Sequence, residues 1–138
     1  MTAPELSPFF GRTLAAQVAE GLDAADAAEV WEFGAGSGAL AEQLLEALGE
    51  RVRRYTIIDV SSALRVRQQA RLARFGPRVQ WAERWPERMQ GVVVGNEVLD
   101  AMPARLVTFD GAAWRERGVV MTEQGPSFED RSLRGDAP

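Results

Sequence analysis

The residues best placed to do chemistry follow two short apolar runs of the sequence. After the first run, the stretch EFGAGSG (32–38) places one carboxylate, Glu32, ahead of three glycines at alternate positions. After the second, GNEVLD (95–100) groups an amide and two acids: Asn96, Glu97 and Asp100. Glycines allow a ligand to approach the backbone closely, and amides between a strand and a helix attract anions. Carboxylates can pair with a cationic substrate and accept its proton.

Glu32 separates two classes of cofactor. Gly34, Gly36 and Ala39 satisfy the dinucleotide pattern G-x-G-x-x-G/A. A dinucleotide brings a pyrophosphate, which Glu32 would repel, whereas S-adenosylmethionine (SAM) brings an ammonium group and a sulfonium. Because a buried carboxylate is costly without a partner, the pattern favours SAM. An NAD-type oxidoreductase and an ordinary glycine turn remain as alternatives.

A second acid is expected to bind the ribose of the cofactor. Asp59 ends the apolar run YTIIDV (55–60), where a carboxylate can accept both ribose hydroxyls. The alternative role for Asp59 is to cap the helix that begins near Ser61. We expect Val60 and Trp85 beside the adenosine, and Trp81 either there or in the core. Asn96, Glu97 and Asp100 also have an alternative to a functional role. They could simply cap the polar junction between a strand and a helix, with the two acids in solvent.

Composition removes several classes of enzyme. The 138 residues include no His and no Cys, which excludes Ser-His-Asp hydrolysis, thiolate nucleophiles and the usual zinc sites, so no metal is expected. All 16 basic residues are Arg, which excludes a lysine Schiff base and a P-loop lysine. The net charge of −4 gives no support for a nucleic-acid partner. No apolar run is long enough for membrane insertion and no signal peptide is recognisable, so the expected location is cytoplasmic.

The spacing of apolar residues predicts the elements that position these side chains. Helices are expected over 8–22, 40–48 and 62–75, and strands over 30–33, 55–60, 78–83 and 92–94. Short apolar strands that alternate with helices imply a parallel sheet covered on both faces. An Asp110–Gly111 turn predicts a hairpin within 105–121. We therefore predict one cofactor-binding domain over 1–125 and a flexible tail over 126–138.

Four segments in this order resemble the MidA-like family of SAM-dependent methyltransferases: TAPELSPFFGRTLA, EFGAGSGALAEQLL, YTIIDVSSALRVRQQ and GNEVLDAMP. The resemblance implies a Rossmann-like three-layer α/β/α fold, SAM as cofactor and S-adenosylhomocysteine as product. It also implies an arginine of a protein partner as methyl acceptor, such as a respiratory-complex subunit. The residues it assigns to the cofactor are Glu32, Gly34, Ala35, Gly36, Gly38 and Asp59. Asn96, Glu97 and Asp100 would lie at the transfer face, and Pro4, Glu5, Ser7 and Phe10 near the acceptor.

The resemblance also predicts a chain truncated at both ends. Strands five to seven of the family order 3-2-1-4-5-7-6 have no counterpart, which leaves the fourth strand at an edge. Exposed strand edges pair with other chains, so we expect either a homodimer through this edge or, preferably, cover by the 105–121 hairpin. A non-catalytic SAM-binding assembly factor is the further alternative.

Overall fold

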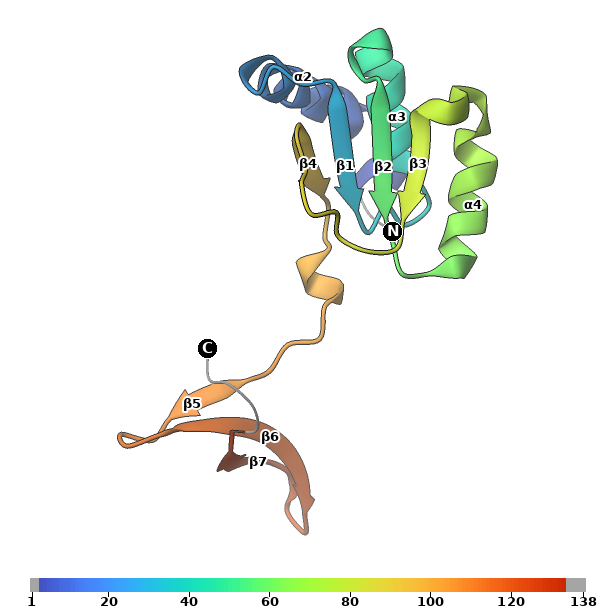
Figure 1. Ribbon diagram of the computed structural model, residues 1–138. Coiled ribbons are helices and arrows are strands. Elements are labelled where there is room, and N and C mark those ends of the chain that lie inside the picture. Colours follow the sequence, from blue (N-terminus) through green and yellow to red (C-terminus); the bar gives the residue numbers. More distant parts are fainter. Residues whose placement is uncertain (1–2, 134–138) are drawn as a thin grey trace. The chain divides into compact units, whose positions relative to one another are not determined.

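The computed structural model describes residues 3–133, which form two compact units divided after Asp100 (Figure 1). In chain order, the elements of the first unit are α1 (Ala3–Leu6), α2 (Pro8–Ala24), β1 (Glu29–Phe33), α3 (Ala39–Leu48), η1 (Gly49–Arg51), β2 (Arg54–Ile58), α4 (Ser62–Leu72), η2 (Ala73–Arg78), β3 (Val79–Ala82) and β4 (Val92–Gly95). A short helix, η3 (Leu99–Ala101), spans the division.

The long helix α2 begins where the sequence predicts. The Ser7 side chain accepts a hydrogen bond from the Phe9 amide at 3.2 Å, and Pro8 occupies the first turn. Proline fits there because its missing N–H has no partner inside a helix. The buried residues of α2 recur every three or four positions, as an amphipathic helix requires: Gly11, Ala15, Val18 and Leu22.

The four strands of the first unit form a parallel sheet in the order β3-β2-β1-β4, as predicted. Glu32 of β1 lies opposite Ile57 of β2 and Val94 of β4. The carboxyl ends of β1, β2 and β4 therefore meet at one edge of the sheet. That edge carries the glycine loop, Asp59 and the GNEVLD segment, and it is where ligands bind in open α/β sheets.

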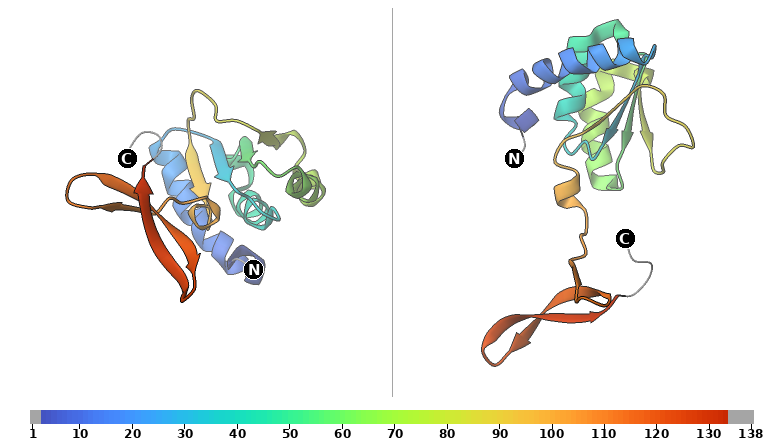
Figure 2. Two further views of the ribbon diagram at one scale, coloured as in Figure 1. Left: turned by 90° about the horizontal axis from the view of Figure 1, so that it is seen from below. Right: turned by 90° about the vertical axis from the view of Figure 1, so that its left-hand side faces the viewer.

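The three long helices α2, α3 and α4 all lie on one face of this sheet (Figure 2, left). They enclose the core with strand residues such as Val30, Tyr55 and Ile57. Right-handed crossovers place the helices on one face when consecutive strands add in one direction, as β1, β2 and β3 do here. Along the other face, Trp85 from the β3–β4 connection packs against Phe33 with ring centroids 4.1 Å apart. The second helical layer expected from the sequence is not present among residues 3–133.

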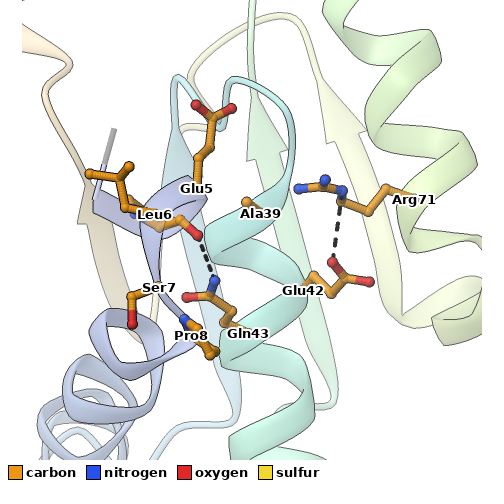
Figure 3. A pocket seen from close by; sticks show the side chains of 9 residues that line it. Glu5, Leu6, Ser7, Pro8, Ala39, Glu42, Gln43 and Arg71 are labelled. Atoms are coloured by element: carbon orange, nitrogen blue, oxygen red, sulfur yellow. Dashed lines mark hydrogen bonds and ion pairs between the residues drawn. The ribbon is translucent and has the colours of Figure 1, made fainter. Parts of the chain in front are cut away.

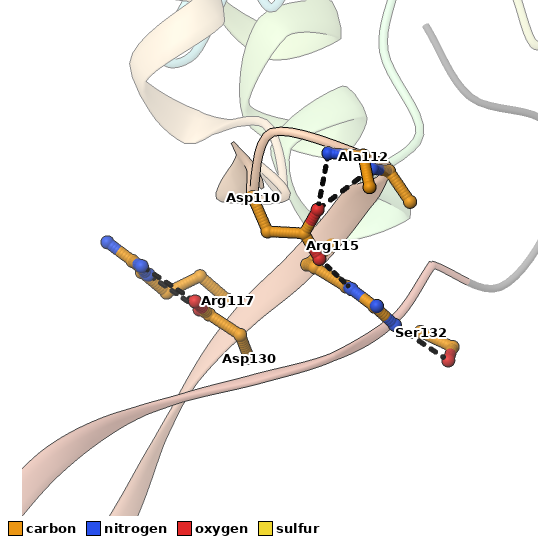
Figure 4. A network of polar contacts seen from close by, with 7 residues as sticks. Asp110, Ala112, Arg115, Arg117, Asp130 and Ser132 are labelled. Atoms are coloured by element: carbon orange, nitrogen blue, oxygen red, sulfur yellow. Dashed lines mark hydrogen bonds and ion pairs between the residues drawn. The ribbon is translucent and has the colours of Figure 1, made fainter.

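The second unit is an antiparallel sheet of β5 (Val107–Phe109), β6 (Trp114–Thr122) and β7 (Gly125–Ser132), in that order. The predicted turn at Asp110 is confirmed (Figure 4). The Asp110 carboxylate accepts from the amides of Ala112 and Ala113 at 2.9 and 2.8 Å, and from Arg115 at 2.7 Å. These donors lower the pKa of Asp110 to about 2, with the Arg115 hydrogen bond contributing most.

The flexible tail predicted from residue 126 is wrong for residues 126–132. They belong to β7, which pairs with β6 along its whole length, and Arg117 forms two hydrogen bonds across the pair with Asp130. The last part of the predicted tail, residues 134–138, lies outside the described residues. The predicted boundary at residue 125 is also displaced, because the division between the units follows Asp100.

The predicted hairpin consists of β5 and β6, which form a separate sheet with β7. The strand β4 is an edge strand of the parallel sheet. The sequence predicts that the hairpin covers β4. Among residues 3–133, no strand of the hairpin pairs with β4. None of the helices in this described range has the length and apolar character needed to cross a membrane.

Candidate cofactor site

The glycine loop between β1 and α3 is shaped by left-handed backbone conformations. Gly34, Gly36 and Gly38 have φ values of 60°, 55° and 79°. A Cβ atom added to Gly36 would meet nothing within 4 Å, so the loop faces open space at this position. The amides of Ala35, Gly36 and Ser37 donate none of the backbone–backbone hydrogen bonds found outside helices and strands among residues 3–133. Such amides before a helix form a site for an anionic group.

Glu32 lines a pocket of about 90 Å³ together with this loop and Asn96. Its side chain is only 2% exposed, and its Oε2 atom accepts a hydrogen bond from the Tyr55 hydroxyl at 2.7 Å. The Tyr55 hydroxyl is neutral, so the negative charge of Glu32 is hydrogen-bonded but not neutralised. A cation that enters the pocket would supply that neutralisation.

Burial raises the pKa of Glu32 from 4.5 to about 7, even though the Tyr55 hydrogen bond opposes the shift. The charge of Asp59 contributes a smaller increase to the same pKa. Perturbed pKa values cluster at functional sites, because such sites bury charges to use them. A nearby ammonium group would stabilise the charged form of such a carboxyl and lower its pKa.

Asp59 lies at the end of β2 beside a second pocket of about 230 Å³. Its Oδ1 atom accepts from the Ser61 amide at 2.9 Å, which is the local bond expected for a capping acid. Its Oδ2 atom accepts from Gln68 Nε2 at 2.9 Å. Each carboxylate oxygen can accept a further hydrogen bond, so these contacts are compatible with ribose binding. Val60, next in the chain, is 96% exposed at the same pocket and offers it an apolar surface.

The N-terminal segment contributes another wall of the Glu32 pocket through Pro4 and Glu5. A hydrogen-bonded clamp holds this segment. Gln43 of α3, labelled in Figure 3, donates to the Pro4 carbonyl at 2.7 Å. It also accepts a hydrogen bond from the Gly11 amide at 3.0 Å. A Cβ atom added to Gly11 would collide with the Oε1 and Cβ atoms of Gln43, so this close approach requires glycine.

A larger, polar pocket of about 480 Å³ adjoins the same segment and is lined by Pro4, Glu5, Ser7, Glu42 and Arg71, among others (Figure 3). Three of the four residues expected near the acceptor therefore line one or both of these pockets. Phe10, the fourth, instead packs against the hydrophobic core.

The three residues expected at the transfer face are placed differently from one another. Asn96 lines the Glu32 pocket, whereas Glu97 and Asp100 are exposed side chains outside that lining. Glu97 has a φ of 55°, a left-handed conformation that non-glycine residues rarely adopt. Such local strain is common where a side chain serves a function.

The aromatic residues expected near adenine are not among the residues that line the Asp59 pocket. Trp85 is 66% exposed and packs on Phe33. Trp81 packs against the core and donates to Gln68 Oε1 at 2.9 Å, which agrees with the core alternative.

Sequence reasoning missed two residues of this site, Tyr55 and Gln68. The contact between Tyr55 and Glu32 depends on strand register, which no local pattern shows. Gln68 carried a weak signal, because it lies between Leu64 and Leu72 at helical spacing and so interrupts an apolar stripe with an amide.

The arrangement fits SAM better than a dinucleotide. The pocket beside the glycine loop holds a buried carboxylate, which suits an ammonium group and disfavours a pyrophosphate. The loop amides suit the carboxylate of an amino acid, and Asp59 with Val60 suits a nucleoside. Among residues 3–133, no cluster of three or more acidic side chains is placed to hold a metal ion.

Comparisons with known proteins point to the same cofactor. Residues 13–137 match the family described as "Putative S-adenosyl-L-methionine-dependent methyltransferase". One similar solved structure is a Burkholderia thailandensis protein described as a "likely methyl transferase" and bound to S-adenosyl-homocysteine. It is 50% identical over 98% of this chain, with a TM-score of 0.79. A native structure of an uncharacterised protein of the same superfamily and organism is 50% identical over 96% of this chain, with a TM-score of 0.78.

The chain spans 37% and 38% of the lengths of these two proteins. A search of curated protein sequences gives no significant match.

Proposed function

Because the chain belongs to a family of S-adenosyl-L-methionine-dependent methyltransferases, we propose that it binds SAM at the glycine loop and contributes to methyl transfer. The observation that carries the proposal is the buried carboxylate of Glu32 in the pocket formed by the glycine loop and Asn96. When bound, SAM supplies a methyl group that its sulfonium already activates. The task of the protein is then to hold the cofactor, align the acceptor and exclude water.

Each part of the cofactor has a partner in this proposal. Glu32 pairs with the ammonium group, while the amides of Ala35 and Gly36 receive the carboxylate. Asp59 accepts the ribose hydroxyls and Val60 packs against the adenine. The exposed surface of Val60 and the open space at Gly36 support these assignments. Trp85 would have to leave Phe33 to cover the adenine as well.

We propose a nitrogen of a protein arginine as the methyl acceptor, with a respiratory-complex subunit as one candidate. The support is the chemistry at the end of β4. Asn96 faces the cofactor pocket and can align an N–H group, and Glu97 is an exposed carboxylate in a strained conformation. Glu97 would accept the proton that the guanidinium loses on methylation. Asp100, one turn further, would pair with the remaining positive charge.

A thermal-shift titration tests the choice of cofactor. S-adenosylhomocysteine should raise the melting temperature of the chain progressively as its concentration increases, since a ligand that binds only the folded state stabilises it. NAD at the same concentrations should leave the melting temperature unchanged. A shift with NAD and none with S-adenosylhomocysteine would support the oxidoreductase alternative instead.

A non-catalytic SAM-binding assembly factor is the second candidate. It is favoured by one observation: the two acids proposed for the transfer step, Glu97 and Asp100, are exposed and lie outside the lining of the Glu32 pocket. Binding of S-adenosylhomocysteine without methylation of any arginine-containing protein substrate would favour this candidate. Methylation that is lost in Glu97→Gln, with cofactor binding retained, would favour the enzyme.

A further inference from the structure

Gln68 is a fully buried amide that lies behind the glycine loop and Asp59 of the candidate cofactor site. It projects from α4 and has no exposed surface. Its Nε2 atom donates to the Gly36 carbonyl at 3.0 Å and to Asp59 Oδ2 at 2.9 Å. Its Oε1 atom accepts from Trp81 Nε1 at 2.9 Å. Both N–H groups and the carbonyl are therefore paired, which offsets the cost of burying an amide.

The chemistry of these partners fixes the orientation of the Gln68 amide. The indole of Trp81 can only donate, whereas the Asp59 carboxylate and the Gly36 carbonyl can only accept. If the amide were reversed, its oxygen would face two acceptors and its NH₂ group would face a donor. Only one orientation satisfies all three contacts, so Trp81 and Gln68 act as one rigid connection.

The connection joins the two halves of the candidate site. Gly36 belongs to the loop beside the Glu32 pocket, and Asp59 belongs to the neighbouring pocket at the end of β2. Within residues 3–133, Asp59 accepts only two hydrogen bonds, from the Ser61 amide and from Gln68. Without Gln68, the carboxylate would keep a single contact and could rotate about its side-chain bonds.

We propose that Gln68, oriented by Trp81, is a positioning residue for the cofactor. It holds the Asp59 carboxylate in the orientation that receives the ribose, and it ties that acid to the glycine loop. The inference rests on the proposed binding of SAM. Gln68 does not touch the cofactor itself and acts through Asp59 and Gly36.

A double-mutant cycle tests whether Gln68 acts through Asp59. Gln68→Met keeps a similar unbranched shape but removes the amide, and Asp59→Ala removes its target. Calorimetric titration with S-adenosylhomocysteine should show about tenfold weaker binding for Gln68→Met. In the Asp59→Ala background, Gln68→Met should cause a much smaller further loss, because coupled residues are not additive. A purely structural role would weaken binding by the same factor in both backgrounds.

The matched control is Gln69→Met, the same substitution at the next, exposed position of α4, and it should leave affinity unchanged. If Gln68→Met does not fold, Trp81→Phe replaces it. That variant keeps an aromatic ring at the position but removes the N–H that orients the amide, together with part of the indole packing, and it should weaken binding by about two- to fivefold.

Binding within a factor of two of the wild type in Gln68→Met, or equal losses in both backgrounds, would overturn the inference and leave the proposed function intact. A wild-type chain that does not bind S-adenosylhomocysteine at all would overturn the proposed function, and this inference with it.

Discussion

At the scale of single residues, the site depends on a carboxylate that is buried before any ligand arrives. Glu32 is shielded from water and has one neutral partner, the Tyr55 hydroxyl. The free energy cost of burying its charge can be recovered when a cation binds. The raised pKa of Glu32 therefore makes both folding and binding sensitive to pH.

Protonation of Glu32 should stabilise the fold. Its pKa is about 7 in the folded chain and near the ordinary 4.5 when unfolded, so the folded state binds more protons between these values. This contribution is fully present below about pH 4.5 and is lost as the pH rises through 7. Urea unfolding at pH 5 and pH 8 should show a smaller pH effect in Glu32→Gln, which cannot titrate. Equal pH effects in the two proteins would contradict the assignment.

Removal of the Tyr55 hydroxyl should raise the pKa of Glu32 further, because that hydroxyl stabilises the charged form. In Tyr55→Phe, fewer molecules carry a charged Glu32 at neutral pH. We therefore expect weaker binding of S-adenosylhomocysteine at pH 7 and recovery of affinity at higher pH. Calorimetric titrations from pH 6 to 9 measure this shift, and a pH profile identical to that of the wild type would exclude the proposed role of the hydroxyl.

At the scale of elements, the N-terminal segment is fixed by a glycine on another helix. Gly11 leaves room for Gln43, whose amide then holds the Pro4 carbonyl beside the cofactor pocket. This explains why PELSPFFG combines a helix cap, a proline and a glycine in so few residues.

Gly11→Ala should destabilise the chain by about 1–3 kcal/mol, since the added methyl group collides with Gln43 in a packed interface. Gly118→Ala is the matched control, because a Cβ atom there meets nothing within 4 Å. Urea unfolding compares the two variants. Similar stabilities would show that Gln43 moves aside without cost and that the clamp is not rigid.

The sequence predicts those elements whose signals are local. The strands β1 to β4 are short apolar runs next to turn residues, and Ser7 and Pro8 mark the start of α2. The strand β7 was missed because GPSFEDRS has no apolar run, and its pairing depends on contacts such as Arg117 with Asp130. Glu32 is a candidate site residue from the sequence because it is a carboxylate inside the apolar run that forms β1. Its hydrogen bond with Tyr55 depends instead on the register between two strands, which no local pattern predicts.

At the scale of the whole molecule, β4 is an edge strand of the parallel sheet. Val93, one of its two inner residues, is 49% exposed, and edges with exposed apolar residues promote pairing between chains. The first unit thus carries a complete set of candidate cofactor residues together with an edge that can receive a further strand.

We expect the chain to self-associate through β4 as its concentration rises. Val93→Lys should weaken this association, because a charge on an edge strand opposes pairing. Val66→Lys, at an exposed position of α4, serves as the control and should associate like the wild type. Sedimentation velocity over a concentration series measures the difference. A monomeric wild type at every concentration would contradict the expectation.

The central claim is that Glu32 binds the amino-acid end of SAM, and one comparison of ligands tests it most directly. S-adenosylhomocysteine carries the ammonium group, whereas 5′-methylthioadenosine has the nucleoside and no amino acid. Calorimetric titration of Glu32→Gln should show about tenfold or greater loss of affinity for the first ligand and none for the second. Equal losses for both ligands, or no loss for either, would contradict the claim.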